Sequence, residues 1–168
     1  QLSFVGTMHS DRYEVINQLQ SQLNGSINAY WYPYLQAPWV YWAYRAAKPA
    51  MRYAQKKDFQ FKPLDTAKVQ EIFARSQAVV DIEHPKQRGL TMRTFETMGA
   101  NKKLITTNQS VRQYDFFRKE NICVIDRKKP NIPVTFWDAS YQPLSPDIYR
   151  KYSLAGWLDE VLGLQVGC

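Results

Sequence analysis

The sequence predicts an α/β fold, a Rossmann-like three-layer α/β/α sandwich with a mainly parallel sheet. Short apolar runs alternate with amphipathic helical stretches along most of the 168 residues. The run AVVDI at 78–82 is nearly continuous in apolar residues, which is typical of a parallel strand buried on both faces. A chain of this length can build one substantial core, so 1–168 is predicted to form a single domain.

Strands and helices are expected in alternation, joined by right-handed crossovers. Strands are predicted at 2–6, 27–35, 58–64, 78–82, 102–107 and 121–126. Helices are predicted at 10–23, 37–57 with a break near Pro49, 66–76, 90–99, 110–117 and 148–163, and 128–146 is a proline-rich connection. Ser10 and Asp65 are the expected N-caps, and Asn24-Gly25 and Gly99 the expected stops. Ligands of such sheets bind beyond the carboxyl ends of the strands, so the residues that follow each strand are the candidates for a site.

Composition limits the kinds of partner. The formal charge of +7 favours a phosphate-bearing or polyanionic partner, or an anionic membrane surface. Basic residues are spread along the chain while aromatic residues concentrate at 30–53, so a nucleic-acid partner is not expected. No apolar run is long enough to span a membrane.

The two cysteines and the first residues predict the setting of the chain. Cys123 lies in an apolar strand and is interpreted as a buried free thiol, and Cys168 is far from it in sequence. A reducing, cytoplasmic setting is therefore expected. The sequence begins in a strand-like run without an initiator methionine, so we expect it to be part of a longer two-domain chain.

The first candidate site is the stretch FVGTMHSDR. Gly6 and Thr7 end a predicted strand just before a helix, where a glycine allows the backbone to approach a phosphate closely. Arg12, in the first helical turn, would add a charge-assisted hydrogen bond. The alternative is a simple tight turn with Arg12 in solvent. The chain has neither the G-x-G-x-x-G nor the P-loop pattern.

The second candidate site is the stretch QRGLTMRTFETMG. Gly89 before a helix would let the backbone N–H groups of Leu90 and Thr91 face an anion, which the helix dipole also favours. Arg88 and Arg93 crowd the same end. Basic residues are unfavourable at a helix N-terminus unless an anion is present, and this conflict indicates a functional site.

Glu96 follows Arg93 by three residues in the same helix. One interpretation is a surface ion pair between them, worth a few tenths of a kcal/mol. The other is a carboxylate that accepts hydrogen bonds from two ribose hydroxyls. Local physics leaves both open.

The third candidate site is DIEH at 81–84. Asp81 and Glu83 have carboxylates that a divalent ion would accept. However, Asp81 falls inside the predicted buried strand, so no metal site is predicted, and Glu83 or His84 is a better candidate for a substrate contact. His9 follows another strand, which is compatible with a crevice shared by both histidines.

The segment VVDIEHPKQRGLTMRTFETMGANKKLITTN, followed by YDFF and NICVID, resembles the carboxyl-terminal half of GT-B-fold glycosyltransferases. It is most similar to bacterial proteins of lipopolysaccharide or capsular polysaccharide synthesis. The resemblance covers most of the chain, and 81–108 is its most specific part. In this fold two Rossmann-like domains face each other. The carboxyl-terminal one binds the nucleotide-sugar donor, and the amino-terminal one binds the acceptor and usually supplies the base.

The resemblance implies roles for residues of the second candidate site. Glu96 matches the acid that holds the ribose. Gly89, Leu90 and Thr91 match the turn and helix start that face the diphosphate. The family typically needs no metal and no cofactor beyond the donor substrate, because the helix dipole and basic side chains stabilise the leaving diphosphate.

The first candidate site also has a counterpart in the family. Gly6 and Thr7 match the first-strand loop near the phosphates, and Arg12 is a candidate phosphate ligand. The chain departs from the family at one point. Many retaining members carry two glutamates eight positions apart, and Arg88 stands eight positions before Glu96. Retention or inversion of the sugar configuration is therefore not assigned.

The expected function is the donor domain of a glycosyltransferase that adds a sugar to a bacterial envelope glycan, at the inner face of the membrane. No catalytic residue is assigned, and without the amino-terminal domain little activity is expected. The aromatic segment 31–44 would face that domain, a lipid-linked acceptor or the membrane. The alternatives are a non-catalytic Rossmann-like interaction module and a nucleotide-sugar epimerase of the same fold.

Overall fold

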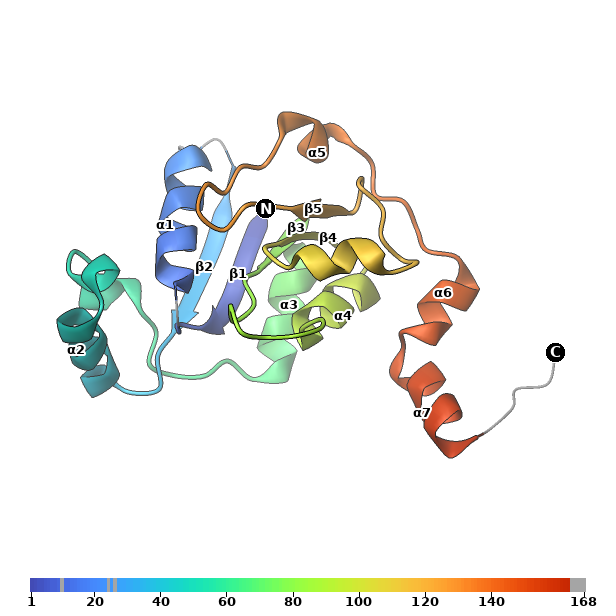
Figure 1. Cartoon of the computed structure of the whole chain (residues 1–168), viewed down its shortest axis with the longest axis horizontal. Helices are drawn as coiled ribbons and strands as arrows, with labels where there is room; N and C mark the ends of the chain where they lie inside the picture. Colours follow the sequence, from blue (N-terminus) through green and yellow to red (C-terminus); the bar gives the residue numbers. More distant parts are fainter. Residues whose placement is uncertain (10, 24, 26, 164–168) are drawn as a thin grey trace.

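The structure is a computed structural model that describes residues 1–9, 11–23, 25 and 27–163. Within these residues the chain folds around a five-stranded parallel sheet in the order β2-β1-β3-β4-β5 (Figure 1). The strands are β1 (Leu2–Thr7), β2 (Ala29–Tyr34), β3 (Ala78–Asp81), β4 (Lys103–Thr106) and β5 (Ile122–Val124). The predicted Rossmann-like α/β fold is confirmed.

Helices cover both faces of the sheet. The α-helices are α1 (Arg12–Leu23), α2 (Pro38–Ala47), α3 (Thr66–Arg75), α4 (Met92–Gly99), α5 (Val134–Asp138), α6 (Pro146–Lys151) and α7 (Leu154–Leu162). The 3-10 helices are η1 (Pro49–Met51), η2 (Lys56–Asp58) and η3 (Gln109–Gln113). The helices α1 and α5 share one apolar cluster with the sheet, whereas α3 and α4 belong to clusters of the opposite face.

The alternation of side chains along β1 explains the two layers. Leu2 and Phe4 are buried in the cluster that contains the apolar residues of α1. Val5 points to the other face, where it packs against Ile72 and Phe73 of α3. Successive side chains of a strand point to opposite faces, so a strand apolar on both faces needs helices on both sides.

The strand order reverses between β1 and β3, which makes their carboxyl ends the switch point of the sheet. A parallel bridge between Tyr34 and Gln60 adds a rudimentary position outside β2. With it, the order corresponds to the doubly wound 3-2-1-4-5-6 arrangement. The strand predicted at 58–64 is otherwise absent from the described residues, because η2 occupies its start and Pro63 has no N–H to donate.

The ends of α3 and α4 are only partly as predicted. Asp65 caps α3 through a 2.7 Å hydrogen bond from the Lys68 backbone N–H, which confirms that cap. In contrast, α4 begins at Met92, after the cap residue Thr91, and the backbone turns left-handed at Asn101 (φ 53) rather than at Gly99. Ser10, Asn24 and Cys168 lie outside the described residues, so their predicted roles are not addressed.

The carboxyl-terminal helix predicted at 148–163 is two helices, α6 and α7. Ser153 separates them, and its side chain accepts a hydrogen bond from the Gly156 N–H. A Cβ at Gly156 would lie 2.0 Å from the carbonyl oxygen of Arg150, so only glycine fits this close approach. Trp157 and Val161, which the helical spacing of apolar residues in 148–163 predicts to face inward, are exposed because α7 extends away from the sheet (Figure 1).

Candidate functional site

A cavity of about 380 Å³ lies at the switch point between β1 and β3. It brings together the first two candidate sites, although they are more than seventy residues apart in sequence. The residues that line it include Gly6, Thr7, Arg12, Asp81, Gln87, Thr91, Arg93 and Glu96. Below, this cavity is called the switch-point crevice.

The end of β1 leaves little room for a side chain at Gly6. A Cβ at Gly6 would lie 3.0 Å from the Phe4 ring and 3.4 Å from Nη1 of Arg12. The missing side chain therefore keeps the floor of the crevice open beside the Arg12 guanidinium. This agrees with the close backbone approach that the sequence predicted for 6–7.

Arg12 is neither in solvent nor free for a ligand, so the simple-turn alternative with a solvated Arg12 is wrong. Its Nε donates to the carbonyl oxygen of Ile82 at 2.5 Å, and Nη1 donates to that of Thr7 at 2.7 Å. The side chain thus ties the end of β1 to the exit of β3. Its positive charge still faces the crevice, and two of its five N–H donors are used for these contacts within the fold.

The start of α4 already holds a carboxylate. Thr91 accepts from the Thr94 N–H and donates to Oδ2 of Asp81 at 2.5 Å. Asp81 is only 4% exposed, and this burial raises the pKa of its carboxyl, against the opposing effects of the Thr91 hydrogen bond and the charge of Arg12. Asp81 therefore lies where a ligand phosphate would compete with it for the helix dipole.

Arg93 joins Glu96 in the crevice. Nη1 of Arg93 lies 2.7 Å from Oε2 of Glu96, and Nη2 donates to the carbonyl oxygen of Val5 at 3.0 Å. The guanidinium also lies over the Phe73 ring, 4.8 Å from its centroid. The ion pair proposed as one interpretation of Glu96 is thus formed, and it is formed inside the cavity. The sequence placed Arg93 among the basic residues that indicate an anion at this helix start, but it gave no binding role to this side chain.

Gly89, Arg88 and Leu90 do not line the crevice. Gly89 has φ +81, a left-handed conformation that favours glycine, and its carbonyl oxygen accepts from Nδ2 of Asn108 at 2.8 Å. Arg88 is exposed, and Leu90 packs against the apolar cluster around Met98. These residues shape the turn that aims α4 at the crevice.

Glu83 is committed to an ion pair. Oε1 of Glu83 lies 2.6 Å from Nη2 of Arg127, and Oε2 accepts from the Thr107 hydroxyl. Nη1 of Arg127 also pairs with Asp11 at 2.7 Å. This network joins the ends of β3 and β4 to the start of α1. A substrate contact by Glu83 would need its partners to move, so its role here is structural.

His9 and His84 meet as the sequence anticipated, with ring centroids 5.2 Å apart. Burial, and then the positive charge of Arg12, lower the pKa of His9 to about 4. Nδ1 of His84 accepts from the Lys86 N–H at 3.1 Å, which fixes its ring beside the turn after β3. The pair stands next to the crevice but does not line it.

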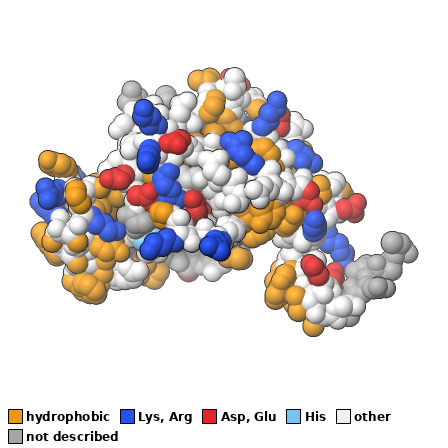
Figure 2. All heavy atoms as spheres, in the orientation of Figure 1, with side chains coloured by type: hydrophobic (Ala, Val, Ile, Leu, Met, Phe, Trp, Pro, Cys, Tyr) orange, Lys and Arg blue, Asp and Glu red, His pale blue; other side chains and the backbone are white. Residues whose placement is uncertain are grey.

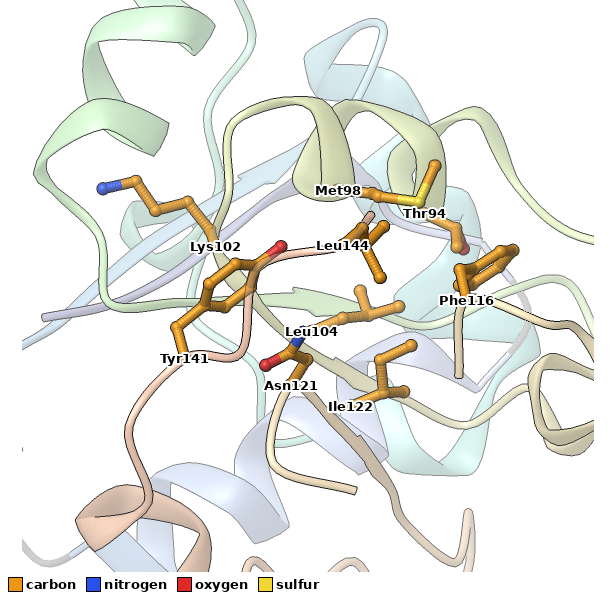
Figure 3. Close-up of a pocket in the computed structure, with 9 residues that line it drawn as sticks. All are labelled: Thr94, Met98, Lys102, Leu104, Phe116, Asn121, Ile122, Tyr141 and Leu144. Atoms are coloured by element: carbon orange, nitrogen blue, oxygen red, sulfur yellow. The ribbon is translucent and has the colours of Figure 1, made fainter. Parts of the chain in front are cut away.

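Two other features of the molecule do not form comparable binding sites. Within the described part of the chain, no group of three or more His, Cys, Asp or Glu side chains could hold a metal ion. A second cavity, under α4, has a volume of about 20 Å³ and lies among Met98, Leu104 and Phe116 (Figure 3). Such a volume holds no more than about one water molecule, so the switch-point crevice is the better candidate for a ligand site.

Comparisons with known proteins supply no family. A scan against protein-family models finds no match, and a search of curated proteins finds no relative of this chain. Function is therefore inferred from the crevice and from the sequence motif that lines it.

Proposed function

We propose that this domain binds a nucleotide-diphosphate sugar in the switch-point crevice and is the donor domain of a GT-B-fold glycosyltransferase. One observation carries the proposal. A cavity of about 380 Å³ at the topological switch point is lined by a glycine loop, a helix start, two guanidinium groups and the carboxylate of Glu96. Doubly wound sheets bind nucleotides at this place, and backbone N–H groups at a helix start favour phosphate.

The roles of the residues follow from their positions. The diphosphate would lie between the Gly6–Thr7 loop and the start of α4, near Arg93. The carboxylate of Glu96, one turn further along α4, would accept hydrogen bonds from the ribose hydroxyls. Fixed positive charge at the diphosphate stabilises it as a leaving group, which is the domain's contribution to sugar transfer.

Binding would rearrange the ion pair that Arg93 and Glu96 form in the crevice. Arg93 would exchange its contact with Glu96 for the diphosphate, and Glu96 would be released for the ribose. Either part of the ligand alone would have to break the ion pair between Arg93 and Glu96. The nucleoside and the diphosphate should therefore each bind weakly alone and bind more tightly when they are joined in one ligand. The acceptor, a bacterial envelope glycan such as lipopolysaccharide or capsule, is proposed from the sequence resemblance, as are the acceptor domain and the site of action at the inner face of the membrane.

Calorimetric titration with UDP, GDP, CDP and ADP tests the proposal, with and without Mg²⁺. We expect one nucleoside diphosphate to bind, independently of Mg²⁺. Glu96→Gln should weaken it about tenfold or more, because a hydrogen bond to a charged group is worth about 1.5–3 kcal/mol. Glu160→Gln, an exposed glutamate on α7, is the matched control and should bind as the wild type does. Absence of binding to all four nucleotides, or equal binding by Glu96→Gln, would contradict the proposal.

A further inference from the structure

The helix α2 presents aromatic side chains to solvent. Trp39 is 71% exposed, Trp42 is 57% exposed, and Tyr53, just after η1, is 92% exposed. The opposite side of the helix is fixed to the core by Val40 and Tyr41, which are buried. The exposed rings therefore stand on a rigid base and are directed outward.

Basic side chains surround these rings. The segment 38–58 carries a single acidic residue, Asp58. Its exposed basic residues are Arg45, Arg52, Lys56 and Lys57. Figure 2 shows hydrophobic and basic side chains intermixed over α2, at the left of the molecule. We name the exposed aromatic and basic residues of 38–57 the α2 patch.

The α2 patch has the composition of a membrane-interface surface. Trp and Tyr favour the level of the lipid headgroups, where one part of the ring is apolar and the other is hydrated. Lys and Arg beside them are attracted by anionic headgroups. Within the described residues no helix is long and apolar enough to cross a membrane, so contact through this patch would be interfacial.

We propose that the α2 patch docks this domain on the surface of an anionic phospholipid membrane. Charge complementarity selects this occupant, because the patch combines exposed indole rings with four exposed cations and the segment 38–58 contains one acidic residue, Asp58. The other exposed apolar surface, on α7, carries Asp159 and Glu160 among its residues and lacks this complementarity.

The α2 patch and the switch-point crevice lie at the same edge of the sheet. The helix α2 follows the carboxyl end of β2, and the switch-point crevice lies at the carboxyl ends of β1 and β3. In a parallel sheet these ends share one edge. Docking through α2 would therefore hold the crevice near the headgroups, and its use in delivering a sugar to a lipid-linked acceptor rests on the proposed function.

Co-sedimentation of the 168-residue chain with vesicles tests the docking. Vesicles of phosphatidylcholine alone are compared with vesicles of equal parts phosphatidylcholine and phosphatidylglycerol. We expect binding to the anionic vesicles only, weakening as salt is added. Arg52→Glu/Lys57→Glu should weaken it about twentyfold or more, since each basic residue near the surface contributes about fivefold. Trp39→Ser should weaken it about tenfold, by loss of aromatic burial.

Two controls separate the patch from charge and aromatic content in general. Lys119→Glu/Lys128→Glu changes the net charge equally at other exposed positions, and Trp157→Ser removes an exposed indole from α7. Both should bind the anionic vesicles within about threefold of the wild type, because screening confines surface attraction to about a Debye length.

Several results would overturn the docking proposal. These are no binding to anionic vesicles, equal binding to neutral vesicles, wild-type binding by both patch variants, or loss of binding in Trp157→Ser. A wild-type dimer that ignores vesicles and is dispersed by Trp39→Ser would assign the patch to a second copy of the chain. The assay contains no nucleotide, so its failure is distinguishable from failure of the donor site.

Discussion

Arg93 and Glu96, one turn apart on α4, neutralise each other inside the switch-point crevice, with Nη1 and Oε2 2.7 Å apart. A surface pair at this spacing contributes only a few tenths of a kcal/mol. Here both side chains also line the crevice, so the pair brings opposite charges together there. In the proposed complex the diphosphate would contact Arg93 and the ribose would contact Glu96. Under the proposed function a nucleotide would therefore separate the ion pair into a cationic and an anionic half of the crevice.

Replacing Arg93 should affect the diphosphate more than the nucleoside. We expect Arg93→Gln to weaken binding of the preferred nucleoside diphosphate about tenfold to a hundredfold, the worth of a hydrogen bond to a charged group. Binding of the nucleoside without phosphates should not weaken, because Glu96 no longer has to be released from Arg93. Calorimetry with both ligands measures the difference, and Arg112→Gln, an exposed arginine of η3, is the control. Equal losses for both ligands would contradict this division of the crevice.

Asp81 should make the protein less stable as the pH rises from acid. Its folded-state pKa is raised by burial, so the folded protein holds the proton more tightly than the unfolded chain. The resulting contribution to the free energy of unfolding is fully present below the pKa that Asp81 has in the unfolded chain. It is lost as the pH rises through the pKa that Asp81 has in the folded protein. Asp81→Asn removes the effect, while its side-chain oxygen still accepts from Thr91.

Thermal unfolding at several pH values checks the role of Asp81. We expect the melting temperature of Asp81→Asn to rise relative to that of the wild type as the pH rises above about 4, the ordinary pKa of an aspartate. The variant should also bind a diphosphate more tightly, because a negative charge leaves the start of α4. A wild type that gains stability relative to Asp81→Asn over that range would contradict the first expectation, and equal or weaker diphosphate binding by the variant would contradict the second.

His9 should titrate well below an ordinary histidine. Its pKa of about 4 reflects burial and the nearby Arg12 charge. A lowered folded-state pKa means that stability is complete above the unfolded value of 6.5 and is lost as the pH falls toward 4. NMR titration of the two imidazole rings, with His9→Gln to assign the signals, measures this directly. A midpoint for His9 near 6.5 would show that its ring is solvated.

Arg127 should matter for stability more than exposed cations do. Arg127→Met leaves the Glu83 carboxylate, whose side chain is 11% exposed, without its ion-pair partner. Breaking such a pair from one side costs about 3–5 kcal/mol when it is fully buried, so we expect a loss of about 2–4 kcal/mol here. Lys151→Met breaks the exposed pair with Asp115 and should cost much less, because solvent screens both charges. Urea unfolding compares the two, and similar losses would contradict a structural role for Arg127.

Several elements of the fold could be predicted because their signals are local. The run at 78–82 is apolar on both faces, and β3 lies there, with Val79 and Val80 fully buried. Asp65 caps α3 as its position before a helical stretch indicated. In the same way, the i,i+3 spacing of Arg93 and Glu96 was sufficient to raise their ion pair as an interpretation.

Other features depend on tertiary contacts that no local pattern encodes. Arg12 donates to carbonyl groups of two strands, one of them seventy residues away, so its structural use was not foreseeable from the turn at 6–9. The sequence favours Glu83 as a substrate contact because its position after a strand is visible locally. Its ion pair with Arg127 is not visible in the sequence, because Arg127 follows a different strand, β5. The helical periodicity of 148–163 indicated an inward face, but α7 has no core element to pack against in the described part of the chain.

A structure of the domain with its preferred nucleoside diphosphate tests the central claim most directly. The proposal predicts the diphosphate between the Gly6–Thr7 loop and the start of α4, within hydrogen-bonding distance of Arg93, and the ribose hydroxyls on Glu96. The Arg93–Glu96 pair, whose Nη1 and Oε2 atoms lie 2.7 Å apart in this structure, should be broken in that complex. A nucleotide bound elsewhere, or bound with the pair intact, would contradict the assignment of the switch-point crevice as a donor site.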